Sequence, residues 1–277
     1  MHRKSIKTSS TKVNDLHKTL NQGMAIFSLQ TIRHWLNCKV EKTRIACGMP
    51  ETTTYILNHF SLIRFKDNYF GLSITERQTF HENFLRDLRK SATAIQVYQV
   101  FPTHTGVDFL VWSSQPLNQT RDAAHFFERL ACATTPYRHL IELVHTLWGY
   151  TKPSQYTRSG STQEIDPFAF ERKPYLVIYP FTKTTEWYQL SQESRQGLMN
   201  GHIKIGKQFP KIHQLLLYSF GLQDQEFVVV YEMDDLTQFS DLVYALRDTD
   251  VRRYTLRDNP LFTAIYHPAE ETLALWA

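Results

Sequence analysis

The strongest constraint on the fold is an internal repeat that occupies most of the chain from Thr53 onward. Three segments recur, namely Leu72-Ser73 as Leu190-Ser191, Phe109-Leu110-Val111 as Phe227-Val228-Val229, and Tyr137 as Tyr254. The first two pairs are separated by 118 positions and the third by 117. A near-constant separation across different kinds of segment indicates a duplication. The sequence therefore predicts two similar halves.

Each half has the pattern of a strand, a helix, a hairpin, a second helix and a last strand. The runs "YLVIYPF" and "EFVVVYEM" are rich in β-branched and aromatic residues, which is typical of strands. Thr75 and Ser191 stand at expected helix starts, before apolar residues spaced by three and four. The stretch "FGLQDQEF" predicts a hairpin turn. We therefore expect an α+β fold of two tandem βαββαβ ferredoxin-like halves, arranged as a dimeric α+β barrel.

The halves are expected at residues 53–150 and 174–268, joined by a polar linker at residues 151–173. Residues 1–50 lie outside the repeat and contain nine Lys and Arg against two acidic residues. The other 227 residues carry 22 basic and 25 acidic groups, so the folded body has no basic excess for binding nucleic acid.

The basic, Ser- and Thr-rich segment at residues 1–50 has two interpretations. It is a disordered arm or a start codon placed too early, with Met49 as the natural start, which predicts a cytoplasmic protein and a dispensable segment 1–48. Alternatively, it is a transit peptide for an organelle such as a plastid. The longest apolar runs are strand-sized, so no membrane span is expected. The three cysteines have no paired spacing, which argues against a disulfide scaffold or a zinc site.

The stretch "MNGHIKIGKQFP" matches most of a phosphate-binding loop, but it lies inside an expected helix and has Gln208 where that loop needs Ser or Thr. On that helix, His202 shares one face with Leu198 and Ile205. Its counterpart in the first half is Phe84. A buried core histidine is one interpretation. A single neutral imidazole without nearby Cys or Asp ligands is not a zinc site, but is compatible with the axial ligand of a haem.

Residues 53–268, and most specifically 174–266, resemble the chlorite dismutase superfamily, which includes the coproheme decarboxylases of haem biosynthesis. The segments that carry the resemblance are "YPFTK…EWYQLSQESR", "LMNGHIKIGKQFP", "SFGLQDQEFVVVYEMDDL" and "LVYALRDTDVRRYTLRDNPLFTA". The resemblance implies an iron porphyrin, haem b or coproheme, in the second half. It also implies a homo-oligomeric ring, commonly a pentamer.

The resemblance places His202 at the position of the proximal iron ligand. Asp250 lies where members that bind haem b often have a carboxylate, which would accept the other N–H of His202 and make the imidazole a stronger donor. Gln214 matches the residue over the open side of the iron, if one residue is deleted near Pro210. Chlorite-degrading members have Arg at this place, and Gln cannot supply that positive charge. The alternatives are a surface charge for Asp250 and a strand-edge amide for Gln214.

Tyr179 and Lys183 match the Tyr and Lys that face the reacting propionates in the decarboxylases. A tyrosine can give up an electron and a proton and then take a hydrogen from the propionate, while an ammonium orients the carboxylate or donates a proton. Trp187 and Tyr188 suit the wall at the haem edge, with polar tips towards the propionates. The alternative for Tyr179 is a strand aromatic that packs on the sheet.

Lys152, Ser154 and Tyr156 in the linker could contact propionates, or they belong to an ordinary polar linker.

Three functions remain open. The first is decarboxylation of coproheme to haem b with hydrogen peroxide or another small oxidant. The second is a peroxidase-like or chlorite-degrading reaction on haem b. The third is a non-enzymatic haem carrier or sensor.

Overall fold

The computed structural model describes residues 55–152 and 163–277, which lie in the compact unit Thr53–Ala277. The expected basic arm, Ser154 and Tyr156 lie outside the described residues. Within the described ranges, no helix is both long and apolar enough to cross a lipid bilayer.

The elements of the first half follow the predicted order. They are β1 (Tyr55–Phe65), α3 (Asp67–Phe70), α4 (Ile74–Ser91), β2 (Ala94–Gln99), β3 (Phe109–Leu117), α5 (Asp122–Thr134), the 3-10 helix η1 (Thr135–Tyr137) and β4 (Ile141–Tyr150). Helix α4 begins one residue after Ser73 and not at Thr75. Ser73 and Glu76 form a capping box, in which each side chain bonds the other's backbone N–H.

The second half repeats this order. Its elements are β5 (Tyr175–Lys183), α6 (Thr185–Gln189), α7 (Gln192–Gly206), β6 (His213–Tyr218), β7 (Phe227–Met233), α8 (Leu236–Arg247), the 3-10 helix η2 (Asp250–Tyr254), β8 (Thr255–Arg257) and β9 (Phe262–Tyr266). Ser191 caps α7 as expected, accepting a hydrogen bond from the backbone of Ser194. The hairpin between β6 and β7 is confirmed, and Gly221 in its turn adopts a φ of +68°.

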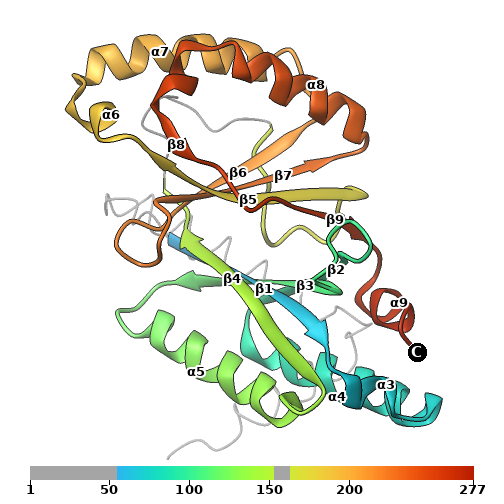
Figure 1. The fold of residues 1–277 in the computed structure, drawn as a ribbon. Coiled ribbons are helices and arrows are strands. Elements are labelled where there is room, and N and C mark those ends of the chain that lie inside the picture. Colours follow the sequence, from blue (N-terminus) through green and yellow to red (C-terminus); the bar gives the residue numbers. More distant parts are fainter. Residues whose placement is uncertain (1–54, 153–162) are drawn as a thin grey trace, which may run out of the picture. The chain divides into compact units, whose positions relative to one another are not determined.

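The strands form a closed barrel that confirms the predicted α+β fold. They pair in the order β7-β6-β4-β1-β3-β2-β9-β5-β8, and a further pairing of β5 with β7 closes the ring, with β8 attached to β5 only. The two halves meet where Tyr150 pairs with Tyr218 and where Tyr98 pairs with Tyr266. Helices α4 and α5 cover the outside of the first half-sheet, and α7 and α8 cover the outside of the second (Figure 1). The barrel interior is a single apolar cluster to which both halves contribute.

Part of the segment interpreted as a linker is packed into the barrel. The backbone N–H of Gln214 donates to the carbonyl of Gln163 at 2.7 Å, and Ile165 belongs to the interior cluster. Further along, Arg172 pairs with Glu232 at 3.4 Å, with both side chains at most 5% exposed. The segment whose polar composition suggested a linker therefore includes residues that lie inside the fold.

The chain ends in a helix, α9 (Ala269–Ala274), that the sequence did not predict. It packs against the first half, where Leu273 is fully buried. The ring of Trp276 lies 5.6 Å from that of Phe65 and 6.2 Å from that of Phe109. The C-terminus thus completes the core of the first half and leaves that of the second to its own residues.

Candidate functional site

One face of the second half-sheet points towards helices α7 and α8. In one row across the sheet, Tyr231 of β7 lies between Gln214 of β6 and Val177 of β5. In the next row on the same face, Tyr179 of β5 pairs with Val229 of β7. Val177, Val229 and Tyr231 pack with residues of both helices in one apolar cluster. Tyr179 on β5 and Gln214 on β6 therefore share the helix-facing side, because side chains alternate between the two faces of a strand.

The separation of 118 positions holds through the paired strands. Val111 pairs with Ser61 in the first half, and Val229 pairs with Tyr179 in the second. Tyr179 therefore occupies the place of Ser61. The same separation equates Lys183 with Phe65, Trp187 with Tyr69 and His202 with Phe84.

These equivalent positions have very different surroundings. In the first half Phe65, Tyr69 and Phe84 are at most 3% exposed, and the rings of Phe65 and Tyr69 stack at 3.9 Å. Helix α4 buries six side chains, whereas α7 has no buried residue. The first half therefore fills the region between helix and sheet with aromatic side chains, and the second half places an imidazole and an ammonium there.

His202 presents its imidazole to this region. Its Nδ1 is buried and has no hydrogen-bond partner. Burial, and secondly the charge of Lys183, lower the pKa of His202 to about 4. The ring is therefore neutral at neutral pH and has a nitrogen lone pair available for a metal.

The expected hydrogen bond from His202 to Asp250 is not formed. Asp250 begins η2, its side chain is 70% exposed, and it pairs with Arg253 at 3.3 Å. Asp250 instead lines a cavity of about 430 Å³ together with Gly197 and Gly201 of α7. Its shorter side chain and its arginine neighbour hold it at the surface, so the alternative interpretation as a surface charge describes this structure.

Lys183 ends β5 next to the aromatic wall. Its Nζ lies 4.7 Å from the ring centre of Trp187 and 3.4 Å from Oγ1 of Thr255. Burial, and secondly the neighbouring Arg252, lower the pKa of Lys183 to about 8, although Glu226 acts in the opposite direction. Among the described residues Lys183 forms no ion pair, so its ammonium is available to an anionic group.

Tyr179 lies four residues before Lys183 on β5, on the face of the sheet that is turned towards the helices. Burial is the largest cause that raises its pKa well above the ordinary value, and the hydroxyl of Tyr231 and the carboxylate of Asp258 add to the effect. The rings of Tyr179 and Tyr231 are stacked at 6.2 Å. Tyr179 is therefore a phenol, not a phenolate, at neutral pH, and it can give up an electron only together with its proton.

The aromatic wall is built by the short helix α6. Trp187 is buried and packs against Tyr254 at 5.7 Å. Tyr188 is partly exposed, and its hydroxyl donates to Glu226 at 2.5 Å. Glu226 also accepts from the backbone N–H of Lys183 at 2.7 Å. The carboxylate of Glu226 therefore links Tyr188 of α6 to Lys183 at the end of β5.

Gln214 and Lys152 lie at the margin of the same face. The side chain of Gln214 is exposed, while its backbone bonds to Gln163 and Ile165 on both sides. Lys152 follows β4, and its Nζ lies 5.2 Å from the ring centres of both Tyr150 and Tyr218. The structure therefore brings Lys183, Trp187 and His202 together most closely, whereas the nearest aromatic partner of Tyr179 is Tyr231.

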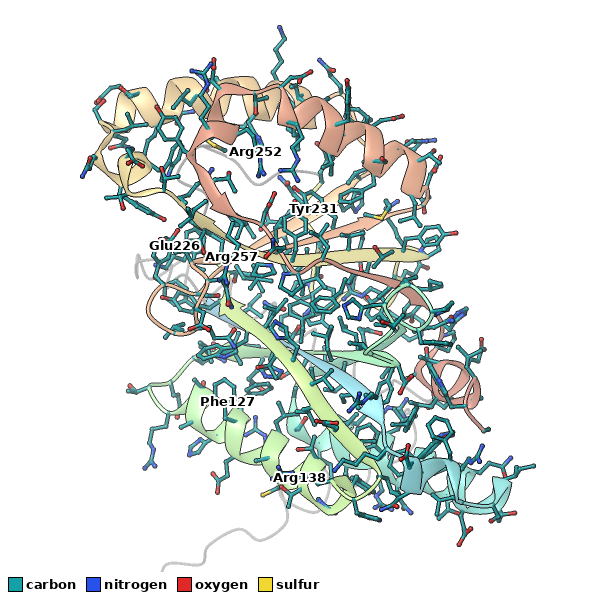
Figure 2. The ribbon with its side chains drawn as sticks, in the orientation of Figure 1. Phe127, Arg138, Glu226, Tyr231, Arg252 and Arg257 are labelled. Carbon is teal, nitrogen blue, oxygen red and sulfur yellow. The ribbon has the colours of Figure 1, made fainter. Side chains whose placement is uncertain are left out.

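Sequence reasoning overlooked several residues in this region. Arg195 lies on the same face of α7 as His202, and its Nε is buried without a partner. Asp258 bonds Arg252 at 2.6 Å and Arg247 at 2.8 Å. Arg252 and Tyr231 both lie between the sheet and helices α7 and α8 (Figure 2). The run "DVRRY" signalled local positive charge, but the sequence does not show which of its two arginines turns inward.

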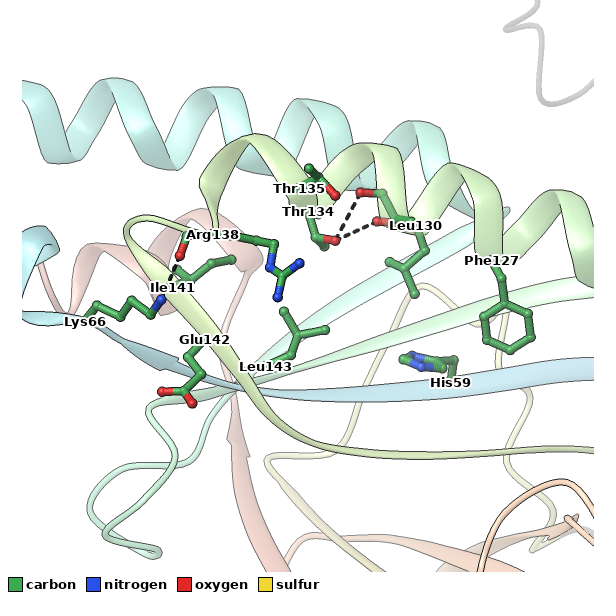
Figure 3. Close-up of a pocket in the computed structure, with 11 residues that line it drawn as sticks. His59, Lys66, Phe127, Leu130, Thr134, Thr135, Arg138, Ile141, Glu142 and Leu143 are labelled. Carbon is green, nitrogen blue, oxygen red and sulfur yellow. Dashed lines mark hydrogen bonds between the residues drawn. The ribbon is translucent and has the colours of Figure 1, made fainter.

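A second cavity, of about 500 Å³, lies in the first half between α5 and strands β1 and β4. Lys66 lies towards one end and Phe127 towards the other, with Arg138 between them (Figure 3). His59 at its wall has a pKa lowered to about 4 by burial. Neither this cavity nor the one beside Asp250 is lined by Tyr179, Lys183 or His202, so neither marks the candidate site.

The residues present fit an iron porphyrin better than a bare metal ion. Over residues 55–152 and 163–277, no group of three or more His, Cys, Asp or Glu could hold a metal ion. A porphyrin supplies most of its iron's ligands itself and needs one protein nitrogen, which His202 offers. The unpartnered nitrogens of His202 and Arg195 on a helix with no buried side chain agree with such a group.

Comparison with known proteins defines the class. The duplicated ferredoxin-like barrel has a histidine on the helix over one half-sheet, an arrangement that fits a haem with one protein ligand. The family model for chlorite dismutase matches residues 74–267, which is most of the chain. The chain therefore belongs to the chlorite dismutase family, whose members bind haem.

Individual relatives agree with this assignment. The chain is 25% identical over 195 residues to a coproheme decarboxylase from Mycolicibacterium smegmatis, which covers 69% of this chain and 81% of the relative. A mutant chlorite dismutase from Candidatus Nitrospira defluvii superposes with a TM-score of 0.71 at 19% identity, covering 80% of this chain and 94% of that one. The chlorite dismutase of the same organism in complex with imidazole gives 0.69 at 19% identity, covering 85% and 99%. These two likenesses show the shared fold.

Proposed function

We propose that the protein is a haem-dependent oxidoreductase that uses hydrogen peroxide to decarboxylate coproheme to haem b. The observation that carries the proposal is the replacement of three core positions of the first half. Ser61, Phe65 and Phe84 become Tyr179, Lys183 and His202, which provide a phenol, an ammonium and a neutral imidazole around one region.

His202 would hold the porphyrin iron, because its ring is neutral and its Nδ1 is unpaired. The bound iron porphyrin supplies the two-electron oxidation by peroxide. Each propionate –CH₂CH₂COOH then becomes a vinyl group and carbon dioxide, while one hydrogen peroxide is reduced to two waters. Two such conversions turn coproheme into haem b.

Tyr179 and Lys183 would serve the propionate itself. The neutral phenol of Tyr179 would lose an electron and its proton, and the resulting phenoxyl would take a hydrogen atom from the propionate β-carbon and so return to the phenol. Loss of a second electron would release carbon dioxide and leave the vinyl group, and peroxide is the final acceptor of both electrons. Lys183 orients the carboxylate, since its ammonium has no competing ion pair among the described residues. With a pKa near 8 it can also move a proton at neutral pH.

The remaining candidates have supporting roles in this proposal. Trp187 and Tyr188 would line the porphyrin edge, and Lys152 would contact a propionate at the rim. Gln214 would face the open side of the iron, where a neutral amide cannot hold an anionic intermediate as a guanidinium can. We therefore expect little conversion of chlorite to oxygen, and we expect Gln214→Arg to raise whatever rate remains.

Mass spectrometry of the pigment tests the proposal. The purified protein loaded with coproheme and given peroxide should lose two carboxyl groups per porphyrin. Tyr179→Phe should bind coproheme yet form almost no haem b, whereas Tyr175→Phe, a second tyrosine of β5, should react like the parent. If the parent forms no haem b at any rate of peroxide supply, the decarboxylase proposal is wrong. A peroxidase-like or carrier function of bound haem b would then replace it.

A further inference from the structure

The cavity between α5 and strands β1 and β4 of the first half is not used by the proposed function. We propose that it binds an elongated organic carboxylate that carries a hydroxyl group at its far end, with the carboxylate at Arg138 and the hydroxyl at His59. The site is separate from the proposed porphyrin site, because Tyr179, Lys183 and His202 do not line it. Its volume of about 500 Å³ is within the range of small-molecule sites.

Positive groups lie at one end of this cavity. Figure 3 shows the guanidinium of Arg138 directed towards Leu143, and among the described residues it forms no side-chain hydrogen bond or ion pair. Lys66 lies beside it, because its ammonium donates to the carbonyl of Arg138 at 2.9 Å. The carboxylate of Glu142, which also lines the cavity, is paired with Arg64 at 2.7 Å. The two remaining cations therefore favour an anion at this end.

A buried histidine lies at the other end of the cavity. His59 is 4% exposed, and the rings of Phe126 and Phe127 each lie 5.9 Å from its imidazole. Its Nδ1 lies 3.3 Å from Oγ of Ser61, and among the described residues its Nε2 has no hydrogen-bond partner. Because burial lowers the pKa of His59 to about 4, the ring is neutral at neutral pH. Its Nε2 donates or accepts according to the tautomer, and a hydroxyl group can serve either role.

Comparison of the two halves shows that the fold does not require this histidine. His59 pairs with Ser113 between β1 and β3, and the equivalent pair of the second half is Val177 and Tyr231. Val177 belongs to an apolar cluster there. Ser113 is fully buried, and its hydroxyl has no hydrogen-bond partner. Buried polar groups without partners cost free energy, so a ligand that bonds the imidazole would offset part of this cost.

Apolar side chains connect the two ends. Leu130 and Phe127 of α5 and Ile141 and Leu143 of β4 line the space between them. The hydroxyl of Thr134, which also lines the cavity, donates to the carbonyl of Leu130 at 2.9 Å within its own helix. It therefore adds no free polar group to the middle of the cavity. An aliphatic chain between the carboxylate and the hydroxyl fits this lining, because its burial removes apolar surface from water.

Two probes that differ only in the far group test both ends of the cavity. The full chain, purified without haem, is titrated with ω-hydroxydecanoate and with decanoate in a calorimeter. The parent should bind one molecule of ω-hydroxydecanoate per chain, and more tightly than decanoate. Arg138→Gln should weaken both probes by roughly fivefold to tenfold, because it removes the cation that binds their common carboxylate. His59→Val should weaken ω-hydroxydecanoate alone, by roughly fivefold, and so remove the preference.

Two further variants complete the test. Arg121→Gln removes an exposed arginine that precedes α5 and does not line the cavity, so both affinities should stay unchanged. Ala131→Phe places a ring at an exposed position of the lining and should weaken both probes. The inference is overturned if the parent binds neither probe, if Arg138→Gln binds both like the parent, or if His59→Val keeps the preference. These titrations use no haem, so their outcome is independent of the decarboxylase proposal.

Discussion

Helices α4 and α7 begin at equivalent serines of the repeat, yet they pack against their sheets in opposite ways. Helix α4 inserts Phe80, Phe84 and Leu88 into a closed aromatic core. Helix α7 has no buried side chain, and its residue Ile205 only borders a smaller cluster, as does Phe209 just after the helix. One fold thus serves as a packed support in the first half and as an open site in the second.

A duplicated fold can thus acquire a binding site when apolar side chains in one copy are replaced by smaller or polar ones. The replacements of Phe84 by His202 and of Phe65 by Lys183 exchange buried apolar surface for polar groups. Each exchange removes roughly 1.5–3 kcal/mol of burial from the second half. The first half, completed by Leu273 and Trp276 from the C-terminus, keeps the full stabilisation.

Truncation of the two equivalent helix residues should give the largest contrast. Phe84→Ala should lower the free energy of unfolding by about 3–5 kcal/mol, because it opens a cavity in a filled core. His202→Ala should change it by less than about 1 kcal/mol in the haem-free protein, because it removes a ring whose Nδ1 is buried without a partner. Urea unfolding measures both. Similar losses for the two variants would show that α7 is packed as tightly as α4.

The next residue along each helix gives a smaller contrast without any polar group. Leu85 is 3% exposed, and its equivalent Ile203 is half-buried. Leu85→Ala should cost about 2–5 kcal/mol and Ile203→Ala about 1 kcal/mol. The same unfolding curves decide the matter. A cost for Ile203→Ala as large as that for Leu85→Ala would contradict an open second half.

The dependence of stability on pH should distinguish His202 by a still smaller effect. Its pKa of about 4 lies below the value of 6.5 in the unfolded chain, so the unfolded state binds more protons between these values. The contribution of neutral His202 to the free energy of unfolding is therefore fully present above pH 6.5 and is lost as the pH falls towards 4. His202→Ala in the haem-free protein should reduce the slope of unfolding free energy against pH by up to about 1.4 kcal/mol per unit. An unchanged slope would mean that the pKa of His202 is the same in the folded and the unfolded chain.

The repeat made much of this architecture predictable. A constant separation of 118 positions fixed the order of elements and the equivalence of His202 with Phe84, because duplicated segments fold alike. The hairpin between β6 and β7 followed from the turn residues in "FGLQDQEF". The exact start of α4 could not be predicted, because Ser73 and Thr75 both suit a helix N-terminus. Only the capping box of Ser73 with Glu76 decides between them.

The surroundings of the site were less predictable, because they depend on long-range contacts. Nothing local indicates that the segment at Gln163 pairs with β6, that Trp276 returns to the first half, or that Arg252 approaches Lys183. The contact of Asp250 with His202 was wrong for the same reason, since a carboxylate at the right sequence position can turn to a neighbouring arginine.

We propose that the second half holds the iron of a porphyrin through His202. The most direct measurement is the absorption and electron paramagnetic resonance of haem-loaded protein, compared with His202→Ala before and after added imidazole. The parent should show a histidine-ligated haem, and the variant should lose that signature and at least tenfold in affinity. Imidazole should restore the signature, because it supplies the missing nitrogen. If His202→Ala keeps the spectrum and affinity of the parent without imidazole, another residue binds the iron and the account of the two halves is wrong.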